Sequence, residues 1–280
     1  MSLGTVEPAT VAPTRRDQKA ARSNDRVFLI LARLGLAVVL VAFWELNSGG
    51  RGSLLPDYAF GTPSAVADQF VKLFSSGEIY SSLWSTVATV LYATLLSAPV
   101  GILLAVATSV PVGRWLLEPL VTITYAVPKV GLISIYILVL GVSGATHIAL
   151  VGGATMFLYY YAMRQAINEI DRRQLIEFRL LGASWLKVAK SLLLRAASPN
   201  LIGATRLALP LGFAIEIFAE LRIPTSSGLG ALLEHDAAAQ NTAGSVAVML
   251  FVLIIGYLLD LALGALLGRH AKSVGVGAIV

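Results

Sequence analysis

The sequence predicts an all-α membrane protein with six transmembrane helices. Of its 280 residues, 56% are hydrophobic and only 13% are charged, and the mean hydropathy is +0.78. A soluble domain usually carries about 25% charged residues. A membrane-spanning helix needs about 20 apolar residues, and the chain contains several windows of that length. They lie at residues 27–46, 83–108, 115–141, 146–166, 201–221 and 245–267.

The basic residues predict the orientation of these helices. With the N-terminus inside, the inner segments hold fifteen of the Lys and Arg residues and the outer segments hold three. Cytoplasmic loops carry an excess of Lys and Arg, so both termini are expected in the cytoplasm. The tail is too long, and the first window too apolar, for a cleaved signal peptide. We therefore divide the chain into a disordered tail (1–24), a transmembrane domain (25–270) and a second cytoplasmic tail (271–280).

Two short segments are expected on the outer side, and neither is large enough to be a domain. In the first, Thr62-Pro63 begins an apolar pattern that includes Val66 and Phe70, which predicts an amphipathic helix on the outer interface. The second, 222–244, contains Pro224 and several glycines. It predicts a turn followed by a short helix over 232–240.

Small residues recur every four positions in the second window, at Ser97, Gly101 and Ala105. This spacing places them on one face of a helix, where they allow another helix to approach closely. We expect this contact to lie within the subunit.

A basic amphipathic segment follows the fourth window, from Gln174 to Pro199. Its apolar residues recur at steps of three and four, which is typical of one helix face. They are Leu175, Phe178, Leu181, Trp185, Val188 and Leu192. Gly182 interrupts the pattern and Ser184 can cap a restarted helix, so two short helices joined at a glycine are expected. The segment either docks a soluble partner or lies in the lipid headgroups.

Ionisable residues inside the membrane are costly and usually face a pathway or a partner. Lys129 follows Pro128 in the third window, where the proline is compatible with a kink. Glu216 and Glu220 share one face of the fifth window, and Glu216 lies at a depth similar to that of Lys129. Lys129 therefore either pairs with Glu216 or supplies positive charge for an anionic solute. Glu220 is expected to be a gate or subunit-contact residue.

The residue patterns argue against catalysis on this chain. His147, His235 and His270 are scattered over a loop, an outer segment and the tail, so they predict no metal site. The chain has no cysteine and shows no nucleophile–base arrangement. It also lacks the G-x-x-x-x-G-K-[ST] phosphate loop, so we expect any ATP and Mg²⁺ to bind on partner subunits.

A series of short motifs occurs in order along the chain. They are Leu55-Pro56, Thr62-Pro63-Ser64-Ala65-Val66, Ser76-Gly77-Glu78, Pro128-Lys129-Val130, Leu138-Val139-Leu140-Gly141-Val142, Leu181-Gly182-Ala183-Ser184, Ala219-Glu220 and Ser227-Gly228-Leu229-Gly230. In this order and spacing, the chain resembles the permease subunits of bacterial ATP-binding-cassette (ABC) importers. Among these it is most similar to the subgroup for nitrate, taurine, alkanesulfonates and related solutes. The resemblance runs from about Leu55 to Leu267.

The chain departs from the family pattern within the cytoplasmic loop. The family carries a Glu-Ala-Ala triplet before the glycine and an apolar-x-Leu-Pro ending. Here the places of the triplet hold Ile176, Glu177 and Phe178, so the glutamate lies one residue late. The place of the proline holds Arg195, and the nearest proline is Pro199.

The resemblance implies a type I importer permease fold in the bacterial inner membrane, with no catalysis on this chain. The loop at about 168–200 would couple to an ATPase, and its expected contact residues are Glu177, Gly182, Ala183, Ser184, Trp185, Lys187 and Val188. The expected pathway or gate residues are Pro128, Lys129, Glu216 and Glu220. The implied partners are a second permease subunit, identical or different, two ATP-binding subunits and an extracytoplasmic solute-binding protein. No nucleic acid is expected, and the solute is expected to be a small anion of the sulfonate, nitrate or aromatic acid type.

Two other classes of protein are weighed against this one. A self-contained secondary transporter or channel would need its own ion-coupling site and often shows inverted repeats, which the sequence does not display. An integral membrane enzyme would need a cluster of histidines or carboxylates, which is also missing from the sequence.

Overall fold

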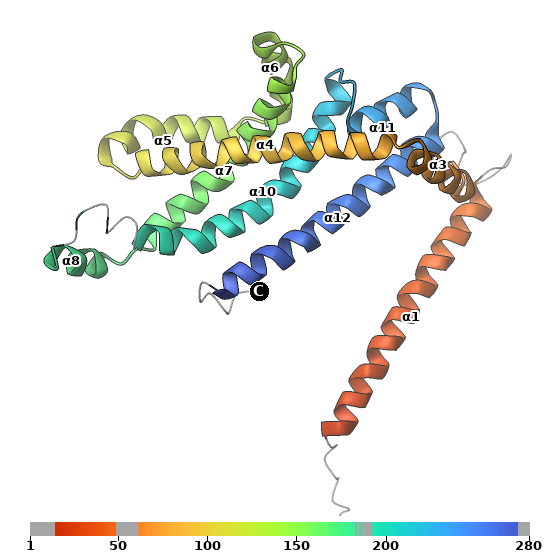
Figure 1. Ribbon diagram of the computed structural model, residues 1–280, viewed down its shortest axis with the longest axis horizontal. Helices are drawn as coiled ribbons and strands as arrows, with labels where there is room; N and C mark the ends of the chain where they lie inside the picture. The colour runs from red at the N-terminus through yellow and green to blue at the C-terminus, as the bar shows by residue number, and fades with distance from the viewer. Residues whose placement is uncertain (1–14, 49–60, 183, 185–186, 188–191, 274–280) are drawn as a thin grey trace, which may run out of the picture. The chain divides into compact units, whose positions relative to one another are not determined.

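The structure is a computed structural model that describes residues 15–48, 61–182, 184, 187 and 192–273 (Figure 1). The described chain is helical. Its elements are α1 (Arg15–Asn47), α3 (Pro63–Ser76), α4 (Glu78–Ala107), α5 (Pro111–Ala126), the 3₁₀ helix η1 (Lys129–Leu132), α6 (Ile133–Leu140), α7 (Gly144–Asn168), α8 (Arg172–Leu180), α10 (Leu194–Arg222), α11 (Leu229–Ala238) and α12 (Thr242–Ser273). These helices form two compact units, residues 1–65 and 66–280.

The first unit consists mainly of α1, which contains the predicted window 27–46. The helix begins at Arg15, so it includes residues 15–24, for which the sequence predicts disorder. Ala, Lys and Arg are strong helix formers and are frequent in this stretch, which accounts for the difference. At its other end, the indole Nε1 of Trp44 donates to the backbone oxygen of Gly61 at 3.1 Å.

In the second unit, α7 is the central helix and packs against α4, α10, η1 and α6. Its contact with α4 is the most extensive in the protein. The small residues Ser97, Gly101 and Ala105 of α4 are all buried, which confirms the predicted close packing within the subunit. At Gly101 the backbones approach so closely that an added Cβ would lie 2.3 Å from the carbonyl oxygen of Met156. Ser97 Oγ and Thr155 Oγ1 form a hydrogen bond of 2.9 Å across the same contact.

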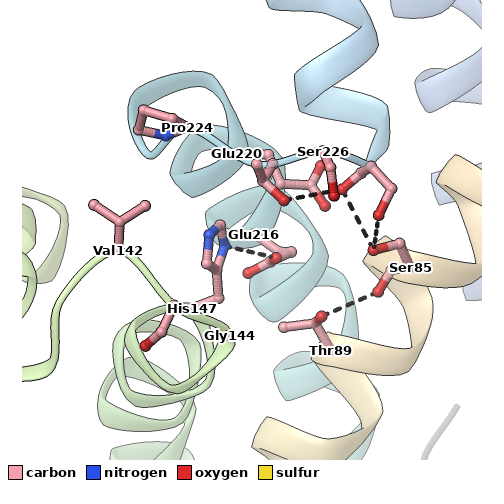
Figure 2. Close-up of a pocket in the computed structure, with 12 residues that line it drawn as sticks. Ser85, Thr89, Val142, Gly144, His147, Glu216, Glu220, Pro224 and Ser226 are labelled. Atoms are coloured by element: carbon pink, nitrogen blue, oxygen red, sulfur yellow. Dashed lines mark hydrogen bonds and ion pairs between the residues drawn. The ribbon is translucent and has the colours of Figure 1, made fainter.

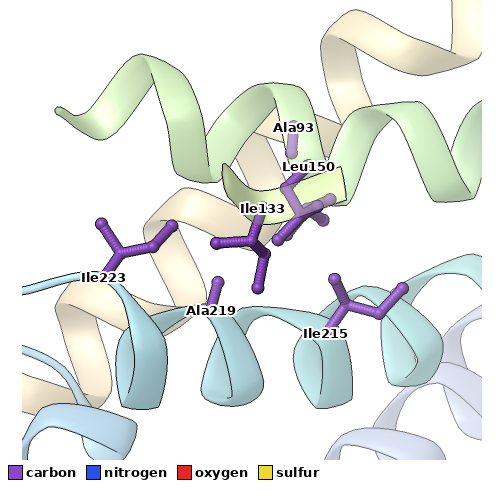
Figure 3. Packing of buried hydrophobic residues seen from close by; sticks show 7 residues of the cluster. Ala93, Ile133, Leu150, Ile215, Ala219 and Ile223 are labelled. Carbon is purple, nitrogen blue, oxygen red and sulfur yellow. The ribbon is translucent and has the colours of Figure 1, made fainter. Parts of the chain in front are cut away.

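One apolar cluster joins the central helices of the second unit (Figure 3). Its buried residues come from α4, α6, α7, α10 and the residue after α10. They are Ala93, Ile133, Leu150, Val151, Ile215, Ala219 and Ile223. The cluster fixes the position of the polar groups described below, because α7 and α10 cannot slide past each other without disrupting it.

The predicted third span is broken at Pro128. Helix α5 ends at Ala126, and the axis of η1 and α6 is turned by 91° from that of α5. Val127 has an extended backbone with ψ 129°, the conformation that a following proline favours. The break is thus where the sequence predicts a kink, but the prediction of one helix over 115–141 is wrong.

Three described helices are long and apolar enough to cross a membrane: α4, α10 and α12. The bent pair of α5 with η1 and α6 makes a fourth if it crosses as one span. The windows 27–46 and 146–166 lie within α1 and α7, which are not among these helices, so the predicted count of six is not confirmed. Helix α7 is rich in Thr, Gly and Tyr, and many of these side chains are buried against neighbouring helices.

Both predicted short helices are present in the structure, whereas their location on the outer side of the membrane stays a prediction. Helix α3 begins at Pro63, and Phe74 of α3 packs edge-on against Phe251 of α12 with ring centroids 5.8 Å apart. The helix predicted over 232–240 is present as α11, which begins earlier, at Leu229.

We predict that Gly101→Ala lowers the thermal unfolding temperature of the detergent-purified protein. The new Cβ must displace backbone of α7, and overpacking of a close contact typically costs about 1–3 kcal/mol. The matched control is Gly203→Ala in α10, because a Cβ there meets nothing within 4 Å. Both changes gain about 1 kcal/mol of helix propensity, so a Gly101→Ala protein as stable as the control would contradict the packing argument.

Candidate functional site

A polar pocket lies where α4, α7, α10 and the segment after α10 meet (Figure 2). Its volume is about 270 Å³. It is lined by Ser85, Thr89, Val142, Ser143, Gly144, His147, Glu216, Glu220, Pro224, Thr225, Ser226 and Ser227. A concave site with a few convergent polar groups is the usual form of a small-molecule site. In the predicted topology, this pocket lies at the outer ends of the helices.

Glu220 joins three helices at the edge of this pocket. Its side chain is buried, with only 4% of the residue exposed. Oε1 accepts a 2.7 Å hydrogen bond from Thr86 Oγ1 of α4, and Oε2 accepts a 2.7 Å bond from the backbone amide of Gly230 in α11. The Thr86 hydroxyl oxygen also accepts from the amide of Leu229 at 3.0 Å. The carboxylate of Glu220 is therefore fully used in holding α10, α4 and α11 together.

The motif Ser227-Gly228-Leu229-Gly230 has a steric explanation. An added Cβ at Gly228 would lie 2.3 Å from Glu220 Cδ, and one at Gly230 would lie 2.3 Å from the carbonyl oxygen of Ile217. Gly228 also has a φ of 146°, which L side chains rarely adopt. Both glycines are needed because the Glu220 carboxylate and the α10 backbone occupy the space of a side chain.

Glu216 lies one turn before Glu220 and has a different environment. Only 1% of Glu216 and 6% of His147 are exposed. The Nδ1 atom of His147, in the first turn of α7, lies 3.0 Å from Glu216 Oε1 (Figure 2). Glu216 Oε2 is buried and has no hydrogen-bond partner among the described residues. Buried polar atoms are nearly always paired, so this oxygen is a candidate ligand-binding atom.

The segment after α10 is held over the pocket by hydroxyl groups. Ser227 Oγ donates to Ser85 Oγ at 3.1 Å, and Ser85 Oγ donates to the backbone oxygen of Ser227 at 3.4 Å. Thr225 Oγ1 also donates to the Ser227 carbonyl, at 3.3 Å. These long, neutral hydrogen bonds connect the segment to α4 more weakly than Glu220 does.

Lys129 lies away from this pocket, and its predicted ion pair with Glu216 is not formed. The ammonium group donates instead to three carbonyl oxygens where α5 ends, those of Thr124, Tyr125 and Val127. It also lies 4.8 Å from the centre of the Phe157 ring. The break after Pro128 leaves the last carbonyls of α5 without amide partners, and a cation there also complements the helix dipole. The solute roles proposed for Pro128 and Lys129 stay predictions.

The predicted coupling residues lie at the other end of α7. Glu177 is exposed on α8, and its backbone oxygen accepts from Leu181 at 3.0 Å. Gly182 ends this helix with φ 71°, as a tight turn requires. Ser184 and Lys187 are exposed, whereas Ala183, Trp185 and Val188 lie outside the described residues. The contact of these residues with an ATPase stays a prediction.

Polar side chains join the two ends of the segment predicted to couple to an ATPase, residues 168–200. Asn200, near the start of α10, donates to Glu169 Oε2 at 3.0 Å. Gln165 of α7 donates to Glu169 Oε1, also at 3.0 Å. Nearby, Arg164 donates to the carbonyl oxygen of Thr108 at 3.2 Å. These bonds connect the coupling segment to both α7 and α10, and they connect α7 to the end of α4.

Sequence reasoning found the two glutamates of the pocket but missed His147 and Thr86. The sequence did contain a signal for His147. This residue lies at the start of the fourth apolar window, and Glu216 and Glu220 lie near the end of the fifth. Antiparallel neighbouring helices place these ends at the same side of the membrane. Thr86 gave no such signal, because buried threonines are common in apolar helices and its partners are distant in sequence.

Residues 97–273 match the protein family described as "Binding-protein-dependent transport system inner membrane component". Over 226 residues the chain is 31% identical to the "Putative aliphatic sulfonates transport permease protein SsuC" of Escherichia coli K12. That alignment covers 80% of this chain and 85% of the relative. The "Taurine transport system permease protein TauC" of the same organism is 24% identical over 240 residues, which cover 84% of this chain and 86% of the relative.

The fold is also similar to that of a solved transporter. A chain of the MetNI methionine ABC transporter, in an inward-facing conformation, superposes with a TM-score of 0.53 at 19% sequence identity. The match covers 71% of this chain and 95% of that chain. At this identity the likeness shows a shared fold only.

We predict that Thr86→Val destabilises the protein. The valine is nearly isosteric but leaves a buried carboxylate oxygen of Glu220 and the Leu229 amide without a partner, which typically costs about 1–3 kcal/mol. Thr86→Ser keeps the hydroxyl and should stay closer to the wild type. Thermal unfolding in detergent would compare the three proteins, and a loss for Thr86→Val no larger than that for Thr86→Ser would contradict the hydrogen-bond argument.

Proposed function

Since the chain belongs to the binding-protein-dependent transport system inner membrane component family, we propose that it forms half of the solute pathway of an ATP-driven importer. It is an ABC importer permease of the sulfonate and taurine subgroup. As such, it is a multi-pass protein of the bacterial cytoplasmic membrane. Membership of this family disfavours a self-contained transporter or a membrane enzyme.

The proposed solute is a small sulfonate-type anion. The names of the two relatives from E. coli, which refer to aliphatic sulfonates and to taurine, support this class. The pocket of about 270 Å³ has room for a solute of this size. In the proposed assembly, a separate extracytoplasmic protein delivers the solute and a second permease subunit, identical or different, completes the pathway.

The proposed coupling element is the segment around Gly182. Two cytoplasmic ATPase subunits, which would bind ATP and Mg²⁺, dock there in this proposal. The main observation that supports this proposal is that Asn200 and Glu169 connect the segment to both central helices, α7 and α10. A displacement of the docked segment would reach α7 and α10, and these two helices line the pocket at their other ends.

We predict that Gly182→Val weakens ATPase binding but leaves the insertion of the chain into the membrane intact. At φ 71° a β-branched residue is strained by about 1–3 kcal/mol and would reorient the residues that follow. ATPase co-purification and solute uptake should both fall at least about tenfold, a change of about 1.4 kcal/mol. The membrane content of the chain should remain normal.

Gly182→Asn is the matched control. Asparagine tolerates a positive φ better than other non-glycine residues, and a Cβ at this position meets nothing within 4 Å. This variant should retain the ATPase and most of the uptake. A Gly182→Val protein with bound ATPase and normal uptake would rule out this loop as the coupling element and favour a helix resting on the lipid surface.

We predict opposite labelling of two single cysteines, because the proposed topology places the segment around Gly182 inside and α11 outside. The natural chain has no cysteine, so Lys187→Cys and Glu234→Cys each introduce one exposed thiol. A membrane-impermeant maleimide added to spheroplasts should label only the Glu234→Cys protein, and inverted vesicles should give the reverse. The same label on both thiols in spheroplasts would contradict the orientation.

A further inference from the structure

The free oxygen of Glu216 marks a binding position inside the pocket. His147 occupies Oε1 at 3.0 Å and thereby fixes the plane of the carboxylate. Oε2 is left buried without a described partner, in a residue that lines the pocket. A buried carboxylate oxygen in this state is costly, and a hydrogen-bond donor supplied from the pocket would remove that cost.

The charge of the pocket selects the kind of donor. Two carboxylates, Glu216 and Glu220, line it together with His147, which is paired with Glu216, and none of the described lining residues is Lys or Arg. An anionic group placed here would be repelled by both carboxylates, whereas a cation would be attracted. The pocket is therefore suited to a positively charged group, even though the proposed solute class is anionic.

Two hydroxyl groups of the pocket, those of Thr89 and Ser143, are oriented as acceptors. Thr89 Oγ1 donates its hydrogen to the carbonyl oxygen of Ser85 at 3.0 Å, and Ser143 Oγ donates to the carbonyl oxygen of Leu140 at 3.1 Å. With their hydrogens committed to backbone oxygens, these hydroxyls can offer only lone pairs to a ligand. A primary ammonium group carries three N–H donors, which match a carboxylate oxygen and neighbouring hydroxyl oxygens.

We propose that this pocket binds a primary ammonium group, which donates a charge-assisted hydrogen bond to Glu216 Oε2. The group can belong to the transported solute or to a free amine in the medium. If it belongs to the solute, the solute carries an ammonium group besides its anionic group. That part of the inference rests on the proposed function, whereas binding of an amine to the pocket does not.

Binding is tested on the detergent-purified complex of this chain with its ATPase. Methylammonium chloride, compared with sodium chloride at equal ionic strength, should raise the thermal unfolding temperature of the wild-type protein. Glu216→Gln keeps an oxygen for His147 but presents an amide to the pocket, so the apparent affinity for methylammonium should fall at least about tenfold. Glu234→Gln removes an exposed carboxylate of α11 outside this pocket and should leave the response unchanged.

A second variant keeps the test decisive if the Glu216→Gln protein misfolds. Thr89→Val removes one acceptor hydroxyl from the pocket wall and should weaken methylammonium binding about threefold. An equal stabilisation by sodium would show a site for inorganic cations and overturn the proposal. A methylammonium response that is unchanged in both pocket variants would overturn it as well.

Uptake identifies the source of the amine. Cells that depend on this chain should import 2-aminoethanesulfonate better than ethanesulfonate, and Glu216→Gln should remove that preference without abolishing ethanesulfonate uptake. Equal import of both solutes by the wild type, together with methylammonium binding, would assign the site to a free amine. Failure to import either solute would count against the proposed sulfonate function, while the binding measurement would still decide whether the pocket takes an ammonium group.

Discussion

The close approach of α4 and α7 at Gly101 is the constraint on which the rest of the second unit depends. A helix that lies with its backbone against another has little freedom to shift, because any side chain at the contact would collide with the carbonyl oxygen of Met156. This contact sets the position of α7, and α10 then packs on α7. The positions of the polar pocket and of the segment around Gly182 both depend on it.

Glu216 and Glu220 show how neighbours decide the role of a residue type. They lie one turn apart on the same face of α10, and both are buried. Glu220 meets a hydroxyl and a backbone amide, so both of its oxygens are satisfied and it acts as a structural connector. Glu216 meets one imidazole, and its other oxygen has no partner among the residues that the structure describes, which leaves capacity for a ligand.

The features that could be predicted from the sequence depend on local patterns. Apolar windows located the helices, the spacing of Ser97, Gly101 and Ala105 indicated the close contact, and Pro128 marked the break. The partner of Lys129 could not be predicted, because the break exposes carbonyl oxygens at the end of α5 that a continuous span would not have offered. The pairing of Glu216 with His147 likewise depends on how two distant helices pack. In the sequence, this pairing was suggested only by the similar membrane depth of the two helix ends that carry these residues.

Helix α7 contains no proline, whereas α4 and α10, the two helices with which it packs most extensively, each contain at least one. Proline removes a backbone hydrogen bond and is a usual place for a helix to bend, so α7 lacks one cause of bending that α4 and α10 have. Its 25 residues extend about 37 Å, from His147 near one end to Glu169 just after the other. A rigid tilt of about 10° around one end would displace the other by roughly 6 Å, more than the rise of one helical turn. In the proposed coupling, a helix of this length would convert a small movement at the Glu169 end into a change of spacing around the Glu216 carboxylate, and Pro210 gives α10 a place to bend with it.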